Sequence, residues 1–273
     1  MPLVYACIAP HGGELVPNLV DDRKGEYRIS RNGMKVLATQ MKAAKPDTIV
    51  VASPHNLRLL KHIGVVLSEN TSGRVKEGRH SISLRSKCDL ELGRTVVSEA
   101  EKRKLPVVAA NYGGLEGPAS DLAMDWGSLI PLWHFIRSGA RQKVLIVTPS
   151  RGIPLGQNFE FGRVIGEISE SVDRRVAFVA SADQAHAHRK DGPYGYSKEA
   201  AAYDRKVREA IKEDRLKSIM KLDPRFVEAA KPDSLWQMVM LAGVLDAVPM
   251  KGRLFSYQVP TYFGMLCAGY TKR

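Results

Sequence analysis

Two histidines hold the same place in two similar stretches of the chain. An apolar run ends at Pro10-His11 in "LVYACIAPHGG", and a second ends at Pro54-His55 in "TIVVASPHN". Taken singly, each histidine is compatible with a turn or with a hydrogen-bonded core residue. The repetition favours a functional role, because a preceding proline restricts the backbone and helps to hold a ligand side chain at a strand end. Two neutral imidazoles joined by one carboxylate can bind a metal ion and leave positions for a substrate and dioxygen.

The elements that would position these histidines alternate between strand-like and helical patterns. Short runs rich in Val, Ile and Ala predict buried strands, and apolar residues at helical spacing predict the helices between them. We predict strands at residues 4–9, 48–54, 62–69, 80–86, 106–111, 143–150, 175–182, 253–260 and 262–270. We predict helices near residues 30–45, 90–104, 127–139 and 161–172, and two more at about 197–222 and 233–247.

This order predicts a single α/β domain over residues 1–273, with a mostly parallel or mixed central sheet covered by helices on both faces. In open α/β sheets, functional groups gather beyond the carboxyl ends of the strands. His11 and His55 would lie there, and so would His186, a few residues beyond the strand at 175–182. We therefore expect three histidines at one edge of the sheet. A local echo, "VASPHN" and "IVTPSR", indicates that two strands leave the sheet in the same way.

Charge and cysteine content narrow the class of protein. The net charge of +12 comes from Lys and Arg interleaved with Glu and Asp, as on solvated helix faces, so we expect no nucleic-acid partner and only a bias toward small anions. Cys7, Cys88 and Cys267 lie far apart in apolar or strand-like surroundings, which is typical of reduced core thiols in the cytoplasm. No run is long enough to cross a bilayer, so we expect no membrane partner.

Five short motifs follow one another along almost the whole chain. They are "IAPHGG", "ASPHN", "MDWGSLIPLWH", "SADQAHAHRKDGPYGY" and "PDSLWQMVMLAG". In this order they resemble the landmarks of the class III extradiol ring-cleavage dioxygenases, the superfamily of the protocatechuate 4,5-dioxygenase catalytic subunit. The resemblance implies an α/β domain that holds Fe(II) through two histidines and one carboxylate, with O₂ and a catecholic or aminophenolic ring as substrates. It matches His11 and His55 to the metal ligands and His186 to the acid/base histidine, and it implies a homo-oligomer.

The third ligand departs from the family pattern. Members usually have Glu at the start of a late helix shortly before Trp, whereas this chain has Asp233 three residues before Trp236. Asp233 is the carboxylate we expect, although an Asp here also suits a helix N-terminus. Glu14, in "HGGEL", is the alternative ligand and Glu228 a poorer one.

A second departure lies in the third motif, where many members have Asp-His-Gly and this chain has Trp126. We expect Trp126 to stack on a ring or to wall the substrate pocket, but it cannot accept a proton. Tyr194 and His188 are further candidates to line that pocket. We expect Asp183 to orient His186.

Two other interpretations stay open. A Memo-like homologue would keep the fold and bind a metal or a partner without dioxygenase activity, which the altered Trp126 favours. A hydrolytic zinc site also accepts a His/His/Asp ligand set. Arg151, Arg189 and Lys190 are candidates to hold a carboxylate on the substrate. We expect His134, on a helix between Trp and Phe, to be structural.

Overall fold

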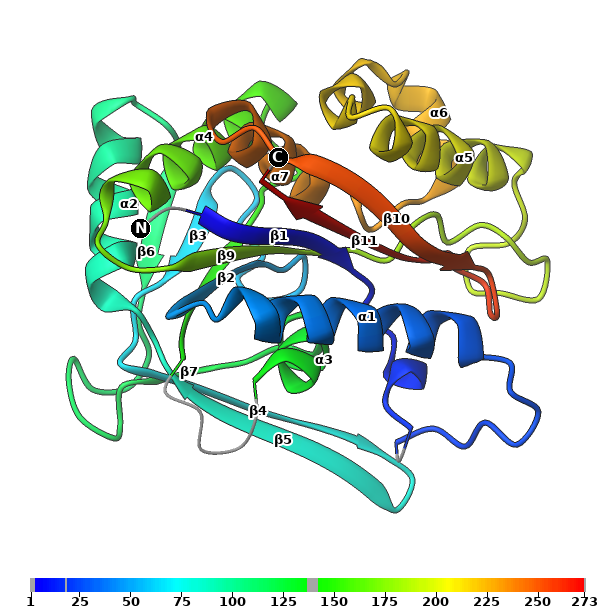
Figure 1. The fold of residues 1–273 in the computed structure, drawn as a ribbon, viewed down its shortest axis with the longest axis horizontal. Coiled ribbons are helices and arrows are strands. Elements are labelled where there is room, and N and C mark those ends of the chain that lie inside the picture. Colours follow the sequence, from blue (N-terminus) through cyan, green and yellow to red (C-terminus); the bar gives the residue numbers. More distant parts are fainter. Residues whose placement is uncertain (1–2, 18, 137–141, 273) are drawn as a thin grey trace.

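The computed structural model describes residues 3–17, 19–136 and 142–272, and its centre is an eight-stranded sheet (Figure 1). The strands are β1 (Leu3–Ala9), β2 (Thr48–Ala52), β3 (Ile63–Val66), β6 (Val107–Ala110), β8 (Lys143–Thr148), β9 (Val176–Ser181), β10 (Lys251–Gln258) and β11 (Met265–Thr271). Their order across the sheet is β10-β11-β1-β9-β2-β8-β3-β6.

The central strands β1, β9, β2 and β8 run parallel to one another. Their carboxyl ends therefore lie at the same edge of the sheet. β3 runs antiparallel to β8, and β11 runs antiparallel to both β1 and β10. The sheet is mixed, and the predicted α/β class is confirmed.

Both faces of the sheet are covered, which explains why its central strands are apolar at almost every position. All five residues of β2 are buried. Val50 and Ala52 pack into one hydrophobic core, while Ile49 and Val51 pack into the core on the other face. This division follows from the alternation of side chains along a strand.

The helices form layers on the two faces of the sheet. They are α1 (Arg28–Ala44), α2 (Leu90–Lys102), α3 (Trp126–Phe135), α4 (Leu155–Ser171), α5 (Lys198–Lys212), α6 (Pro224–Ala230) and α7 (Leu235–Ala247), with 3-10 turns η1 (Gly13–Leu15) and η2 (Leu216–Lys221). Figure 1 shows α2, α4, α5, α6 and α7 on one side of the sheet and α1 and α3 on the other. Within the described part of the chain, none of the helices is long and apolar enough to cross a membrane.

A second, three-stranded sheet lies beyond α3 (Figure 1). It consists of β4 (Asn70–Glu77), β5 (His80–Lys87) and β7 (Asp121–Ala123), in the order β5-β4-β7. The sequence prediction included β5 but missed β4, because "NTSGRVKE" is polar and mostly not buried. It also missed α6, although Asp223 caps this helix by accepting hydrogen bonds from the backbone N–H groups of Arg225 and Phe226. The last part of the helix predicted at 127–139, residues 137–139, lies outside the described residues.

Candidate metal centre

Three donor atoms from distant parts of the chain converge at the carboxyl edge of the central sheet. His11 follows β1, His55 follows β2, and Asp233 precedes α7. Nε2 of His55 lies 3.2 Å from Nε2 of His11 and 2.9 Å from Oδ2 of Asp233, and the His11–Asp233 distance is 3.4 Å. Ligands that share a transition metal at bond lengths of about 2.0–2.2 Å lie roughly 3–3.5 Å apart. The spacing therefore fits a metal ion, and the described residues contain no second group of three such donors.

The ring of His11 is held so that Nε2 faces the other two donors. Nδ1 lies 2.9 Å from Oγ of Ser181, the last residue of β9, and that hydroxyl donates to the Gly127 carbonyl at 2.5 Å. Because the hydroxyl has a single proton, it must accept a hydrogen bond from Nδ1–H. Nε2 is therefore the nitrogen of this buried ring that is left to bind a metal.

His55 is held by the start of α3. The carboxylate of Asp125 accepts hydrogen bonds from Ser53 Oγ at 2.5 Å and from Asn56 Nδ2 at 3.1 Å, which lie on either side of His55 in the chain. The indole of Trp126 stacks on the imidazole, with ring centroids 4.1 Å apart and 25° between the planes. These contacts fix the His55 loop and cover one face of its ring.

Asp233 is held through its backbone and through both carboxylate oxygens. Its carbonyl accepts a 2.6 Å hydrogen bond from Gln237 Nε2, which also donates to the carbonyl of Ser181 at 2.9 Å. Oδ2 faces the two imidazoles, while Oδ1 accepts from Arg151. Burial raises the pKa of Asp233, but hydrogen bonds from the two imidazoles bring it well below its ordinary range. The side chain is therefore a carboxylate.

The electrostatic field of the site favours positive charge. Burial lowers the pKa of His11, but Asp183, Asp233 and Asp125 raise it to about 9. Asp183 is in direct contact: Oδ1 accepts the backbone N–H of His11 at 3.0 Å, and Oδ2 lies 3.3 Å from Nε2. A site that stabilises a proton on a buried imidazole also attracts a divalent cation, whose binding displaces that proton. Donor types, spacing and charge all fit a metal bound by two histidines and one carboxylate.

His186 lies beside these donors without joining them. Its Nδ1 is 2.9 Å from the carbonyl of Gln184, which can only accept, so Nδ1 carries the proton. The ring stacks on Phe263 with centroids 5.1 Å apart and meets Tyr194 edge-on at 5.7 Å. Burial lowers the pKa of His186, although Asp183 opposes the shift. A neutral ring with an open Nε2 is suited to accept a proton near neutral pH.

The three donors and His186 line one cavity of about 440 Å³, a size common for small-molecule sites. Aromatic rings form much of its wall, namely Trp126, Tyr194, Trp236, Tyr262 and Phe263. Of its basic side chains, Arg151 pairs with Asp233 and Lys231 pairs with Glu228. Arg58 also lines the cavity and has no ion-pair partner within the described part of the chain.

Comparison with known proteins decides the family. A family model described as the catalytic LigB subunit of aromatic ring-opening dioxygenase matches residues 5–266. The chain belongs to this family. It is also 23% identical over 252 residues to Protein CA_C1420 of Clostridium acetobutylicum, in an alignment that covers 92% of this chain and 54% of that protein. The chain thus spans about half the length of this relative.

A solved structure has the same fold as this LigB-family chain. The crystal structure of the uncharacterized protein JW3007 from Escherichia coli K12 superposes with a TM-score of 0.59 and 17% sequence identity. The match covers 97% of this chain and 99% of the other. At this identity the likeness shows the fold alone.

In this LigB-family protein, the predicted metal ligands lie together, and the two alternatives to Asp233 lie apart from them. His11, His55 and Asp233 form the converging group. Glu14 lines the same cavity, where burial raises the pKa of its carboxyl group, but it is not part of that group. Glu228 forms an ion pair with Lys231. Asp233 is therefore the carboxylate that the geometry favours.

Two predicted roles need correction. Asp183 contacts His11, by the two interactions described above, and makes no hydrogen bond to His186 among the described residues. His188 is not among the described residues that line the cavity; its Nε2 lies 2.9 Å from Oδ2 of Asp204. Asp204 is fully buried and needs hydrogen-bond donors, which explains why His188 turns toward it. Tyr194 and Trp126 do line the cavity.

The sequence interpretation missed the residues that orient the ligands. Asp125 could have been found from the sequence, because Asp directly before an apolar helix is a typical N-cap residue. In the structure its side chain accepts a hydrogen bond from the backbone N–H of Ser128. Gly127 must be glycine, since an added Cβ would lie 2.6 Å from Ser53 Oγ and 3.2 Å from Cδ2 of His55. Ser181 had no such signal, because its sequence context is that of the last residue of an ordinary strand.

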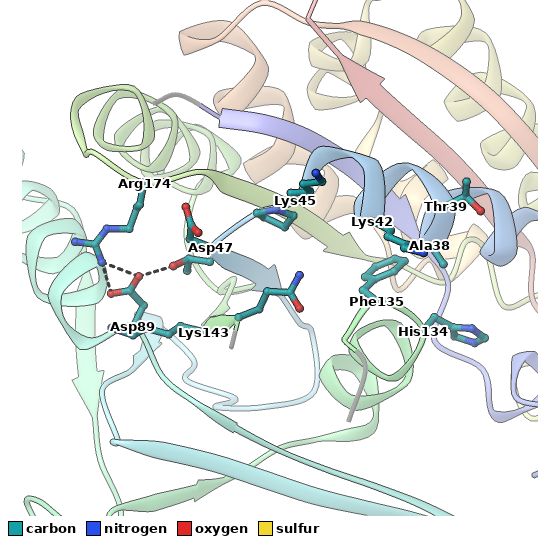
Figure 2. Close-up of a pocket in the computed structure, with 13 residues that line it drawn as sticks. Ala38, Thr39, Lys42, Lys45, Asp47, Asp89, His134, Phe135, Lys143 and Arg174 are labelled. Carbon is teal, nitrogen blue, oxygen red and sulfur yellow. Dashed lines mark hydrogen bonds and ion pairs between the residues drawn. The ribbon is translucent and has the colours of Figure 1, made fainter. Parts of the chain in front are cut away.

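A larger cavity of about 920 Å³ lies at the opposite, amino edge of the sheet (Figure 2). It borders Thr48 at the start of β2 and Lys143 at the start of β8. Its buried carboxylate, Asp89, is occupied by Thr48 and by Arg174, whose Nη1 lies 2.9 Å from each carboxylate oxygen. Because the buried carboxylate of the larger cavity is paired within the protein, the smaller cavity is the better candidate for chemistry.

Proposed function

We propose that this protein is a non-haem Fe(II)-dependent extradiol dioxygenase, which inserts both atoms of O₂ into a catecholic or aminophenolic ring and opens the ring. The observation that carries the proposal is the convergence of His11 Nε2, His55 Nε2 and Asp233 Oδ2. Two imidazoles and one carboxylate suit Fe(II) oxygenases because open positions remain for substrate and dioxygen. Membership of a family of aromatic ring-opening dioxygenases supports the same assignment.

Bound Fe(II) would supply the redox chemistry between the ring and O₂. The protein's own part is to hold the ligands, to place the ring and to move a proton. We assign proton transfer to His186, whose Nδ1–H is fixed on the Gln184 carbonyl. Its Nε2 would accept a proton from a ring hydroxyl as the substrate binds and return it later.

The cavity walls suit a planar ring. Trp126 and Tyr194 contribute aromatic rings to the cavity wall, and aromatic rings interact favourably with one another. Trp126 also covers one face of His55, which limits the directions from which a ring can approach. We therefore propose that both residues position the substrate.

The test is O₂ uptake by protein loaded anaerobically with Fe(II) and mixed with protocatechuate, homoprotocatechuate, catechol or 2-aminophenol. We expect O₂ consumption with at least one ring, together with a new yellow ring-fission product. His186→Ala should keep its iron and lose most of this activity, whereas His11→Ala should lose the iron. Stoichiometric iron without O₂ uptake on any of the four compounds would contradict the proposal.

One observation favours a second candidate, a Memo-like homologue that binds a metal or partner without ring cleavage. Trp126 stacks on His55 in the motif where many family members have a histidine. An indole cannot take a proton from a substrate, so one proton-transfer group of the family is missing. The same uptake experiment separates the two candidates.

The cytoplasmic location and the homo-oligomer stay predictions from the sequence.

A further inference from the structure

The strand next to the His55 strand delivers one more side chain to the metal centre, Arg151. β2 and β8 are parallel neighbours with Ala52 opposite Val147, and each continues in a similar motif, "SPHN" after Ala52 and "TPSR" after Val147. In the first motif the functional side chain is His55. In the second it is Arg151, whose guanidinium reaches Asp233. Two neighbouring strands thus each supply a side chain that contacts the Asp233 carboxylate.

The backbone that carries Arg151 is firmly held. The buried side chain of Asn158 accepts from the Ser150 N–H at 3.2 Å and donates to the Ser150 carbonyl at 2.9 Å. On the other side, Gly152 packs so closely that an added Cβ would lie 2.0 Å from the Leu60 carbonyl oxygen. Arg151 therefore extends from a fixed point on the sheet edge.

The guanidinium lies between Asp233, just before α7, and Trp236, in the first turn of α7. It pairs with Asp233 Oδ1 and lies over the indole of Trp236, with the carbon at its centre 4.4 Å from the ring centroid. A cation over an indole face is held by the ring quadrupole. Oδ1 is thereby occupied, and Oδ2 is the oxygen that faces His55 at 2.9 Å.

We propose that Arg151 is a positioning residue for the metal carboxylate, held in place by Trp236, and that it restricts Asp233 to one metal-binding oxygen. Aspartate is short and can turn both oxygens toward one ion, which would fill a position needed by substrate or dioxygen. The Arg151 contact prevents this by binding Oδ1. The proposal rests on the proposed metal site, but it concerns metal binding and not turnover.

The sign of the change in metal affinity on removal of Arg151 distinguishes a positioning role from a purely electrostatic one. Through space, a guanidinium repels a divalent cation, so removing it should tighten metal binding. If Arg151 positions Asp233, removing it should weaken binding, because loss of a partner that orients a ligand typically costs about 10–100-fold in metal affinity. Opposite signs are therefore expected from the two effects.

The experiment measures Co(II) affinity by calorimetry and Co(II) visible absorption, without diol or O₂. We expect Arg151→Met to bind Co(II) about 10–100-fold more weakly, and its visible bands to be less intense because both Asp233 oxygens then reach the metal. Arg151→Lys and Trp236→Phe should lie closer to wild type, which also guards against a folding defect in Arg151→Met. Arg58→Met is the matched control, because Arg58 lines the same cavity without contacting a ligand in the described structure. Its Co(II) spectrum should not change, and its Co(II) affinity should be equal to that of wild type or slightly higher.

Unchanged or tighter Co(II) binding by Arg151→Met would overturn the proposal. So would an equal loss in Arg58→Met, because the loss would then not depend on the contact with Asp233. Wild-type protein that binds Co(II) as expected, yet shows no O₂ uptake with Fe(II), would contradict the proposed function and leave the role of Arg151 intact.

Discussion

The hydroxyl of Ser181 bridges Nδ1 of His11, at 2.9 Å, and the carbonyl of Gly127, at 2.5 Å. The bridge connects the ends of β1 and β9 with the first turn of α3, and it determines which nitrogen of His11, a proposed metal ligand, carries the proton. Its direction is fixed by chemistry, because the carbonyl can only accept a hydrogen bond.

Replacing Ser181 by Ala should weaken metal binding without unfolding the protein. The variant removes the acceptor for His11 Nδ1–H, so the ring no longer has a preferred tautomer and orientation. We expect metal affinity to fall by about 10-fold, at the lower end of the range for such partners. Calorimetric titration with Co(II) measures the change. Ser171→Ala, at the exposed end of α4, is the control; equal affinities for the two variants would show that the bridge has no role.

Replacing Asp233 by Asn should abolish stoichiometric metal binding. Asn keeps the size of the side chain and leaves the backbone carbonyl that accepts from Gln237 in place, but it removes the negative charge that a cation requires. We expect affinity to fall by at least about 100-fold, at or beyond the upper end of the range for outer-shell partners. Asp246→Asn, also on α7 but paired with Lys217 near the surface, should bind metal as wild type does. Full metal occupancy of Asp233→Asn would direct attention to Glu14.

The convergence of His11 and His55 was predictable because its signal is local. Each stands directly after a buried strand, and parallel strands bring their carboxyl ends to one edge. Ser181 was not predictable, because its contact with His11 depends on the register of β9 against β1, which pairs Ser181 with Ala9. Arg151 was only one of three candidates to hold a substrate carboxylate, since its sequence context does not reveal that Asp233 is within reach. Both contacts, of Ser181 with His11 and of Arg151 with Asp233, depend on packing between segments that are far apart in the sequence.

His186→Ala should separate proton transfer from metal binding. The ring lies beside the three donors without sharing their contacts, so we expect unchanged iron content and a loss of about 10²–10⁴-fold in kcat, the range for removal of a general acid or base. Iron analysis and O₂ uptake on the same sample measure both quantities. His188→Ala is the comparison, since His188 contacts Asp204 and does not line the cavity in the described structure. A similar loss in both variants would argue against the assignment.

The acid limb of kcat/KM should lie below pH 6.5. Burial lowers the pKa of His186 and His11 adds to this, while Asp183, Asp233 and the Gln184 carbonyl oppose it. A base with a lowered pKa stays unprotonated at lower pH, so activity persists below the pKa of an ordinary histidine. Tyr194 and Tyr262 also face the ring.

Phe263→Ala provides the matching variant, because it removes the ring stacked on His186 and lets water reach the imidazole. Its acid limb should move up toward pH 6.5. The pH profiles of kcat/KM for the two proteins make the comparison. An acid limb above pH 6.5 in wild type would contradict the proposed environment of this base.

His134, at the end of α3 and far from the metal centre, should make stability depend on pH. Burial lowers the pKa of His134 to about 4, and Arg31 adds to the shift. The unfolded chain takes up a proton at this residue below about pH 6.5, whereas the folded chain does so only near pH 4. Stability is therefore unaffected above pH 6.5 and falls as the pH is lowered from 6.5 toward 4. The contribution is on the order of 1–3 kcal/mol.

Urea unfolding of wild type and His134→Gln at pH 7 and pH 4.5 tests this effect. Glutamine has no charge at either pH, so the variant should lose less free energy of unfolding than wild type when the pH is lowered. Gln also removes a ring nitrogen, Nε2, that has no hydrogen-bond partner within the described part of the chain. His62→Gln, at an exposed position, is the control and should retain the wild-type pH dependence. The difference is expected because protonating a buried imidazole costs free energy in the folded state. Equal losses in wild type and His134→Gln would mean that the protonation of this residue is not coupled to folding.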